Sequence, residues 1–516
     1  MTQPDATQVT GADLPTEMTN SPLYNPDLAP TPMAHRTWTT YNFAALWIAM
    51  AHCLPTYMLA GGLITLGMNW WQALLTIFLG NIIVLVPILL NAHPGTKYGI
   101  PFPVLARSSF GTTGANIPAI LRAIVACGWF GIQCFIGGEA VRVFLETLWP
   151  AFANIGGGEK IFDLAIPSLI TLLIFWAINL VIVLKGVQAV RVFENWSAPI
   201  IMLLALWLLV WVVARAGGLG PMLDRPSSFA THAEFWRVFV PSLTGMVGFW
   251  ATLSLNIPDF TRYGRGQKQQ MLGQAIGLPT TMVLFSAMAI VITSASETVL
   301  KGTDPTTLWD PIVVLGHLTS STAPPGLDAP LIQDPFMRVA IALLSLVGVA
   351  VATISTNIAA NVVGPANDFS QLAPRLISFK TGSLITAVIG LLIMPWKLLA
   401  SADVYIFNWL IGYSALLGPI AGIMIVDYWI LRRRTLHVMD LYQPHGRYAG
   451  VNKIALIALA LGVAPNVLGF LKSVKMRHGP PDFFDAIYPY AWFTGVLVAG
   501  GIYWLFSPTR YDRMRS

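Results

Sequence analysis

Aromatic and amide side chains stand close together in one long apolar stretch, in the run Trp129-Phe130-Gly131-Ile132-Gln133. Trp129 and Gln133 are four residues apart and therefore share one face of a helix, and Gly131 lets a neighbouring helix approach closely. An indole face can stack on a flat ring, while an amide donates to and accepts from the edge of that ring. The pair predicts a site for a flat, polar heterocycle. The alternative is an interfacial tryptophan beside a glutamine that bonds to another helix.

A second polar cluster, suited to a small cation, lies in the run 352–361, which reads ATISTNIAAN. Ser355 and Thr356 place two hydroxyls side by side, and Asn361 follows about one and a half turns later. Hydroxyls in membrane helices usually bond to their own backbone or to another helix. Combined with backbone carbonyls freed from a broken helix, however, these two would complete a cage of hard oxygen ligands.

Two apolar stretches are interrupted at their centres by residues that break helices. Stretch 44–65 contains HCLPT at 52–56, and stretch 239–255 contains GMVGFW at 245–250. In lipid, a broken helix is tolerated only where its freed backbone groups line a cavity or bind something. Broken helices at corresponding positions in two halves of a chain indicate a transporter with its substrate site near the bilayer midplane.

The composition agrees with a chain that lies mostly in the membrane. Of 516 residues, 55% are hydrophobic and only 10% are charged, against roughly 25% charged in a soluble domain. Apolar runs of about 20 residues predict about twelve spans, and no stretch outside them is long enough for a second domain. The predicted spans are 41–66, 71–92, 116–147, 162–184, 197–215, 235–256, 271–296, 336–364, 381–395, 404–431, 453–470 and 486–506.

The distribution of charge predicts the orientation and the domain boundaries. Basic residues gather in alternate loops, which places both termini in the cytoplasm of a plasma membrane, in particular a bacterial inner membrane. Residues 1–34 are polar and contain no Lys or Arg, so we expect a disordered cytoplasmic tail. The transporter core would cover 35–432, and 433–516 would hold two peripheral spans and a short cytoplasmic C-terminus. The net charge of +6 follows topology and does not indicate nucleic acid.

At these residues the chain closely resembles the nucleobase:cation symporter-1 family, which includes hydantoin, allantoin, cytosine, uracil and purine carriers. The matching runs extend from the N-terminal segment to about span ten, whereas spans eleven and twelve match more loosely. The runs are NPDLAP at 25–30, PTY at 55–57, HPGTKYG at 93–99, ARSSFG at 106–111, STN at 355–357 and LGP at 417–419.

The resemblance implies an all-α membrane fold of the LeuT type, with two inverted five-helix repeats, spans one to five and six to ten, plus two peripheral helices. It implies that a substrate ring lies between Trp129 and Trp250, with Gln133 and Asn361 bonding to its amide groups. It also implies a sodium site. Its ligands would be the carbonyls of Ala49, His52 and Ala352 and the hydroxyls of Ser355 and Thr356.

Two positions depart from the hydantoin carriers of this family and bear on the substrate. Cys53 replaces an amide side chain that would help to bind the substrate, and a thiol is a weaker donor and acceptor. Phe249 replaces a small glycine just before Trp250. The run 248–253, GFWATL, looks more like the plant-type branch that carries uracil and purines. We therefore expect a nucleobase, uracil first, with hydantoin or allantoin as the alternative.

The coupling ion is sodium or a proton. The two hydroxyls favour sodium, whereas protons would need a titratable group near the pathway, for which His52, Glu139 and Asp259 are the candidates. We expect Glu139 to pair with Arg142, and Asp259 to end span six and pair with Arg262.

Other classes of function fit the sequence poorly. An enzyme would need a nucleophile, an acid–base pair or a metal cluster, and a channel would need charged rings or a carbonyl filter; the sequence offers none of these patterns. The three cysteines, Cys53, Cys127 and Cys134, lie in apolar segments and predict neither disulfides nor zinc. We expect a monomer without a cofactor, whose partners are the lipid bilayer, a heterocyclic substrate and a cation.

Overall fold

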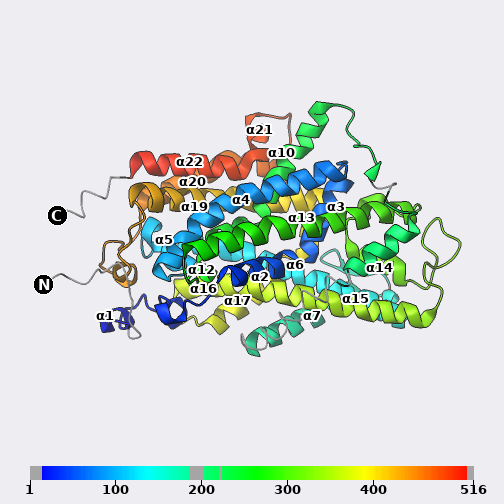
Figure 1. The fold of residues 1–516 in the computed structure, drawn as a ribbon, viewed down its shortest axis with the longest axis horizontal. Helices are drawn as coiled ribbons and strands as arrows, with labels where there is room; N and C mark the ends of the chain where they lie inside the picture. Colours follow the sequence, from blue (N-terminus) through cyan, green and yellow to red (C-terminus); the bar gives the residue numbers. More distant parts are fainter. Residues whose placement is uncertain (1–13, 186–202, 204, 220–222, 508–516) are drawn as a thin grey trace.

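The computed structural model describes residues 14–185, 203, 205–219 and 223–507. These residues form an elongated bundle of roughly parallel helices (Figure 1). The helix α1 and the C-terminal end of α22 lie at the same end of the bundle, which we call the termini side. A two-stranded antiparallel hairpin, Lys160–Ile161 (β1) with Leu164–Ala165 (β2), interrupts the helical architecture between the third and fourth spans.

The first half of the chain contains the first five spans and their connections. Its helices are α1 (Thr16–Thr19), η1 (Pro26–Leu28), η2 (Met33–His35), α2 (Thr40–Ala51), α3 (Leu54–Thr65), α4 (Trp70–Tyr98), α5 (Phe102–Phe110), α6 (Asn116–Leu148), η3 (Pro150–Asn154), α7 (Ile166–Lys185) and the helix Ala205–Arg215.

The second half begins with the sixth span. Its helices are α10 (His232–Phe249), α11 (Ala251–Asn256), α12 (Pro258–Thr261), α13 (Gln267–Val299), η4 (Pro305–Thr307), α14 (Pro311–Thr319), α15 (Pro335–Thr356), η5 (Asn357–Val362), α16 (Val363–Leu372), α17 (Phe379–Leu392), α18 (Pro395–Leu398), η6 (Val404–Leu410), α19 (Ile411–Ile425), η7 (Val426–Leu431), η8 (Met439–Tyr442), α20 (Lys453–Ser473), α21 (Phe483–Ile487), η9 (Tyr488–Tyr490) and α22 (Ala491–Phe506).

Each predicted span corresponds to one or more of these helices, apart from part of the fifth. Of the predicted span 197–215, residues 197–202 and 204 lie outside the described residues. Within the described part of the chain, eight helices are long and apolar enough to cross a membrane, or nine with the bent pair α2–α3. The ninth span is shorter, because α17 has only 14 residues.

The first span is broken where the sequence predicts it. α2 ends at Ala51, α3 begins at Leu54, and the two axes differ by 60°. Pro55 stands in the first turn of α3, where its missing N–H costs no helical hydrogen bond. His52 and Cys53 therefore form a short extended connection in the middle of the bundle, and the last carbonyls of α2 point into it.

The sixth span is interrupted at Trp250, two residues after the second of the two glycines, Gly248. α10 continues through Gly245 and Gly248 to Phe249, and the helical geometry changes at Trp250. The two glycines serve packing, because a Cβ at Gly248 would overlap Ser414 and the backbone of Leu410 in the tenth span. The tyrosine hydroxyl of Tyr413 accordingly donates to the Gly248 carbonyl at 2.8 Å.

The eighth span contains a π-helix that the sequence does not announce. α15 ends at Thr356, the π-helix η5 covers Asn357–Val362, and α16 continues to Leu372. A π segment inserts extra residues into a helical turn and often marks a functional site. Here it rotates Asn361 relative to the helix that carries Ser355 and Thr356.

The N-terminal segment differs from the predicted disordered tail in residues 14–34. Asn25 donates its side-chain amide to the Pro374 carbonyl at 2.8 Å, and the Tyr442 hydroxyl donates to the Leu28 carbonyl at 2.6 Å. These bonds attach residues 14–34 to the loops of the termini side. A polar, proline-rich segment cannot form a hydrophobic core of its own, so hydrogen bonds to neighbouring loops hold it in place. Residues 1–13 lie outside the described part of the chain.

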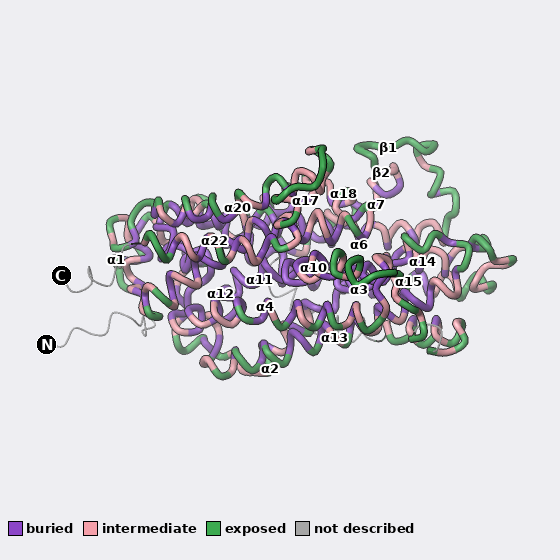
Figure 2. The backbone as a smooth tube through the Cα atoms, turned by 90° about the horizontal axis from the view of Figure 1, so that it is seen from above, coloured by how far each residue is buried: buried purple, intermediate pink, exposed green. Residues whose placement is uncertain are grey.

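Burial separates the core helices from the peripheral ones. Figure 2 shows buried backbone concentrated in the middle of the bundle, with exposed residues at its ends and outer faces. α20 and α22 lie beside each other along one edge in Figure 1, and only a third of their apolar windows is buried. They therefore form the predicted pair of peripheral spans, while the broken spans lie inside.

Candidate functional site

One pocket brings together all six residues that the sequence analysis assigns to the substrate. The interrupted first and sixth spans both contribute to its wall, as do α6 and the π-helix η5. The six residues are Cys53, Trp129, Gln133, Phe249, Trp250 and Asn361. Their convergence from four distant parts of the chain supports the predicted site, and binding itself stays a prediction.

Buried polar atoms without partners point to a ligand in this pocket. Gln133 Oε1, Trp250 Nε1 and Thr356 Oγ1 are buried and have no hydrogen-bond partner among the described residues. All three residues line the pocket. An unsatisfied buried donor or acceptor costs about 1–3 kcal/mol, so a ligand that supplies the missing partners recovers that free energy. The Gln133 oxygen accepts a hydrogen bond, the Trp250 indole N–H donates one, and the Thr356 hydroxyl can do both. Together they can bind the edge of a ring that carries amide groups.

Neighbouring side chains hold one amide of the site, Asn361, in place. Asn361 donates from Nδ2 to Asn357 Oδ1 at 3.1 Å, and Asn357 in turn donates to the Phe130 carbonyl at 3.3 Å and to Asn179 Oδ1 at 3.2 Å. The chain of amides connects η5 with α6 and α7. Because Asn361 is fixed in this way, its orientation is set before any substrate arrives.

Phe249 occupies the space between the two tryptophans. Its ring contacts Trp129 edge-on at a centroid distance of 5.3 Å and Trp250 edge-on at 4.9 Å. Trp250 is supported from behind by Trp47 at 5.0 Å. The resemblance to hydantoin carriers predicts a substrate ring between Trp129 and Trp250, and in this structure a side chain of the protein lies there instead.

Three aromatic residues of the tenth span, which the sequence analysis does not assign to the site, complete the cage around Trp129. Tyr405, Trp409 and Tyr413 contact its ring at centroid distances of 6.2, 6.1 and 6.3 Å. They are spaced by four residues and therefore share one helical face. The four-residue spacing could have indicated an aromatic helix face from the sequence, but it does not show which helix that face contacts.

The pocket is small in this conformation. Its volume is about 20 Å³, which is room for about one water molecule. A heterocycle is larger, so binding requires a side chain to move, and Phe249 is the one that separates the two indoles. Phe249, one of the two residues that depart from the hydantoin pattern, therefore fills space that a substrate ring would need.

The predicted cation ligands come from elements that pack together. α15, which carries Ala352, Ser355 and Thr356, contacts both α2 and α3, at whose junction Ala49 and His52 lie. Thr356 Oγ1 is buried without a partner among the described residues, as an unliganded oxygen of a cation site would be. These residues therefore fit a small cation with oxygen ligands, and the assignment of sodium to them stays a prediction.

The three titratable candidates for proton coupling have different surroundings. The His52 ring is buried, with Nδ1 2.6 Å from the Ile48 carbonyl, and its Nε2 has no partner among the described residues. Glu139 forms the expected ion pair with Arg142 at 2.8 Å. The expected pairing of Asp259 with Arg262 is wrong, because the Asp259 carboxylate accepts from the Phe102 amide at 2.9 Å and from Asn256 at 3.2 Å.

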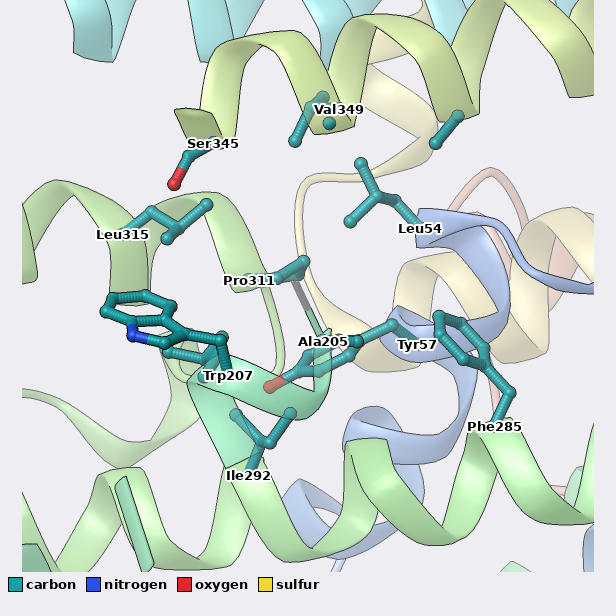
Figure 3. Close-up of a pocket in the computed structure, with 13 residues that line it drawn as sticks. Leu54, Tyr57, Ala205, Trp207, Phe285, Ile292, Pro311, Leu315, Ser345 and Val349 are labelled. Carbon is teal, nitrogen blue, oxygen red and sulfur yellow. The ribbon is translucent and has the colours of Figure 1, made fainter. Parts of the chain in front are cut away.

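A second pocket, of about 90 Å³, lies near the first turn of α3 and is almost wholly apolar (Figure 3). Leu54, Leu315 and Val349 point into it, and the Tyr57 and Phe285 rings form one wall. Because nearly all of its surface is hydrocarbon, it cannot satisfy the donors and acceptors of a polar heterocycle. The aromatic pocket around Trp129 is therefore the better substrate site.

Comparison with known proteins agrees with this geometry. Residues 30–495 match the family described as permease for cytosine/purines, uracil, thiamine, allantoin. The chain is 41% identical to the purine-uracil permease NCS1 of Arabidopsis thaliana, over 96% of this chain and 79% of that protein. It is 40% identical to the allantoin permease of Bacillus subtilis, over 92% of this chain and 91% of that protein.

A solved structure shares the fold as well. The inward-facing conformation of Mhp1 superposes with a TM-score of 0.72 at 25% identity, covering 96% of this chain and 95% of that one. Because the two chains superpose over nearly their whole lengths, the likeness covers the spans that line the aromatic pocket as well as the rest of the bundle.

Proposed function

This chain belongs to the family of permeases for cytosine/purines, uracil, thiamine and allantoin, the nucleobase:cation symporter-1 family, and from that premise we propose that it imports uracil with sodium. It is a multi-pass membrane transporter and not an enzyme. The observation that carries the proposal is the aromatic pocket with its unpartnered Gln133, Trp250 and Thr356 atoms. In the proposed orientation both termini face the cytoplasm of a plasma membrane.

A flat ring with alternating donors and acceptors suits this pocket. A substrate ring would displace Phe249 and stack on Trp129 or Trp250, since aromatic surfaces stack on one another. Gln133 and Asn361 would then bond to its edge, as amides can both donate and accept. Uracil, a single six-membered ring with two carbonyls and two N–H groups, supplies partners for both amides.

The smaller size of uracil favours it over allantoin, because uracil requires a smaller displacement of Phe249. Allantoin carries a ureido chain beyond its ring and needs more room, while Phe249 already fills the space between the indoles. Cys53 contributes a thiol, whose Sγ lies 3.3 Å from Thr56 Oγ1, and not a strong amide donor. Allantoin remains the second candidate, because the Bacillus subtilis allantoin permease is 40% identical to this chain.

A competition experiment tests the choice of substrate. Cells that express this chain would take up radiolabelled uracil in the presence of excess unlabelled uracil, adenine, guanine, cytosine, hydantoin or allantoin. We expect strong competition by uracil, with or without the purines. Competition by hydantoin or allantoin alone would contradict the proposal and assign the same pocket to the second candidate.

Shortening Phe249 should widen the specificity of the transporter. In Phe249→Ala the space between Trp129 and Trp250 is free, so larger substrates such as allantoin should compete with uracil about tenfold better. A tenfold change in affinity corresponds to about 1.4 kcal/mol of binding free energy. The measurement is the inhibition constant of allantoin against labelled uracil. Phe239→Ala, on the same helix but outside the pocket, is the control and should leave that constant unchanged. A Phe249→Ala variant with native selectivity would show that this ring does not limit the pocket.

A further inference from the structure

A chain of three asparagine side chains leads away from the aromatic pocket into the bundle. Asn361, in the π-helix η5, lines the pocket. Asn357 lies four residues earlier in the same π-helix, and Asn179 belongs to α7, which contributes no residue to the pocket wall. Both Asn179 and Asn357 are fully buried. The chain therefore connects the predicted substrate site with a helix that lies outside it.

Two backbone carbonyls fix the direction of the hydrogen bonds in this chain. A carbonyl oxygen only accepts, so the amide atom that bonds to it must be the nitrogen. Asn179 Nδ2 lies 2.9 Å from the Phe175 carbonyl, and Asn357 Nδ2 lies 3.3 Å from the Phe130 carbonyl. Either amide, if turned over, would place its oxygen against another acceptor. The oxygen of Asn179 therefore accepts from Asn357 Nδ2, at 3.2 Å.

The same reasoning sets the orientation of Asn361. Because Asn357 Nδ2 donates to Phe130 and Asn179, the oxygen of Asn357 is the atom left for Asn361, which donates to it from Nδ2 at 3.1 Å. Turning Asn361 over would bring two amide oxygens together at that distance. Asn361 Oδ1 accepts no hydrogen bond from the described residues. Of the two polar ends of this amide, the acceptor is therefore the one left for a ligand.

Another buried asparagine shows what a purely local hydrogen bond looks like. Asn81, in α4, donates to the Ile77 carbonyl four residues earlier, as Asn179 does to Phe175. Such a bond to the preceding turn is a common way for a polar side chain to be satisfied within its own helix. The Asn81 oxygen has no partner among the described residues, whereas the Asn179 oxygen reaches another span. Local bonding alone does not account for the contact between Asn179 and Asn357.

We propose that Asn357 and Asn179 are positioning residues that make Asn361 a fixed hydrogen-bond acceptor. The pocket then selects rings that present an N–H group to η5, and it rejects rings that have lost that group. This inference rests on the proposed function and narrows its substrate class. Uracil meets the requirement with either of its two N–H groups. A ring without an N–H at that place leaves the Asn361 oxygen without a partner in a buried site, which lowers affinity.

Competition by rings that differ at one nitrogen tests this selection in the native protein. The two mono-N-methyluracils each lack one N–H group of uracil, and thymine, which carries its methyl group on carbon, is the control for size. At least one N-methyluracil should compete with labelled uracil about tenfold more weakly than uracil or thymine does, because a buried acceptor stays unsatisfied. Competition by both N-methyluracils within about twofold of uracil would overturn the proposal without any variant.

Variants of the two positioning residues test how the selection arises. Asn357→Leu leaves the Asn361 amide free to turn, so the inhibition constant of the rejected N-methyluracil relative to that of uracil should fall about fivefold or more. Asn179→Leu should lower this ratio less, because Asn357 still donates to the Phe130 carbonyl. In Asn179→Asp, a protonated carboxyl can accept from Asn357 and donate to Phe175, so the native ratio should return. A merely structural role would change the amount of protein or the maximal rate and leave this ratio unchanged.

Asn81→Leu is the matched control, because it removes a buried amide that bonds only within its own helix. It should keep the native ratio. An unchanged ratio in Asn357→Leu, or an Asn179→Asp variant that discriminates no better than Asn179→Leu, would contradict the positioning role. If the native protein takes up no uracil, the proposed function fails separately. Labelled hydantoin or allantoin, in competition with its own N-methyl derivatives, then decides the present proposal, which equal competition by the parent ring and every derivative would overturn.

Discussion

Replacing Trp129 by alanine is expected to lower saturable uracil uptake about 100-fold or more, while the protein still reaches the membrane. Stacking of a base on an aromatic side chain contributes about 1–3 kcal/mol, and each 1.4 kcal/mol changes affinity tenfold. Trp129 also contacts Phe249 and three aromatic residues of the tenth span, so its loss disrupts the cage as well. Trp250→Ala should have a similar effect, and the double variant should show no saturable uptake.

The measurement is initial uptake against substrate concentration, normalised to the amount of protein in the membrane. Trp149→Ala provides a matched control, because Trp149 follows the last turn of the same helix, α6, and is 56% exposed. It should transport like the native protein. If both Trp129→Ala and Trp250→Ala take up uracil as the native protein does, the substrate does not bind in the aromatic pocket.

Removing the two hydroxyls of the eighth span should produce the second large effect, a loss of sodium dependence. Hydrogen bonds and similar contacts to a charged group are worth about 1.5–3 kcal/mol each. In Ser355→Ala/Thr356→Ala, two such oxygen ligands are lost together, so the sodium concentration for half-maximal uptake should rise about 100-fold. Uptake of labelled uracil over a range of sodium concentrations, at constant ionic strength, measures this shift.

Thr353→Ala is the control for that variant. Thr353 lies in the same helix and is fully buried, but its hydroxyl donates to the Val349 carbonyl at 2.7 Å and is therefore occupied within the helix. Its removal should leave the sodium dependence unchanged. If the double variant also keeps native sodium sensitivity, the cation does not bind at Ser355 and Thr356, and proton coupling through His52 becomes the account to test.

The positions of the spans and of the first break follow from local patterns in the sequence. Apolar runs fix helices because lipid requires satisfied backbone groups, and Pro55 after His52 and Cys53 ends one helix and begins the next. The convergence of Trp129, Gln133, Trp250 and Asn361 is also predictable, but only through the resemblance to a family. Periodicity alone places each residue on a face and does not say which faces meet.

What the sequence leaves open depends on contacts between distant helices. Gly245 and Gly248 look like helix breakers, yet both lie inside a continuous helix, where another span packs closely against them. The π-helix after Thr356 and the position of Phe249 between two indoles likewise arise from packing, which no local pattern encodes. The same holds for the bond between Asn179 and Asn357, which are 178 residues apart in the chain.

The central claim is that sodium drives the uptake of a nucleobase through the pocket at Trp129. The most direct test is uptake of radiolabelled uracil into proteoliposomes that contain only this protein, with an inward sodium gradient or with sodium replaced by choline. We predict concentrative uptake that requires the gradient and is lost in Trp129→Ala. Absence of uracil uptake by the native protein under both conditions, or equal uptake with and without sodium, would contradict the account.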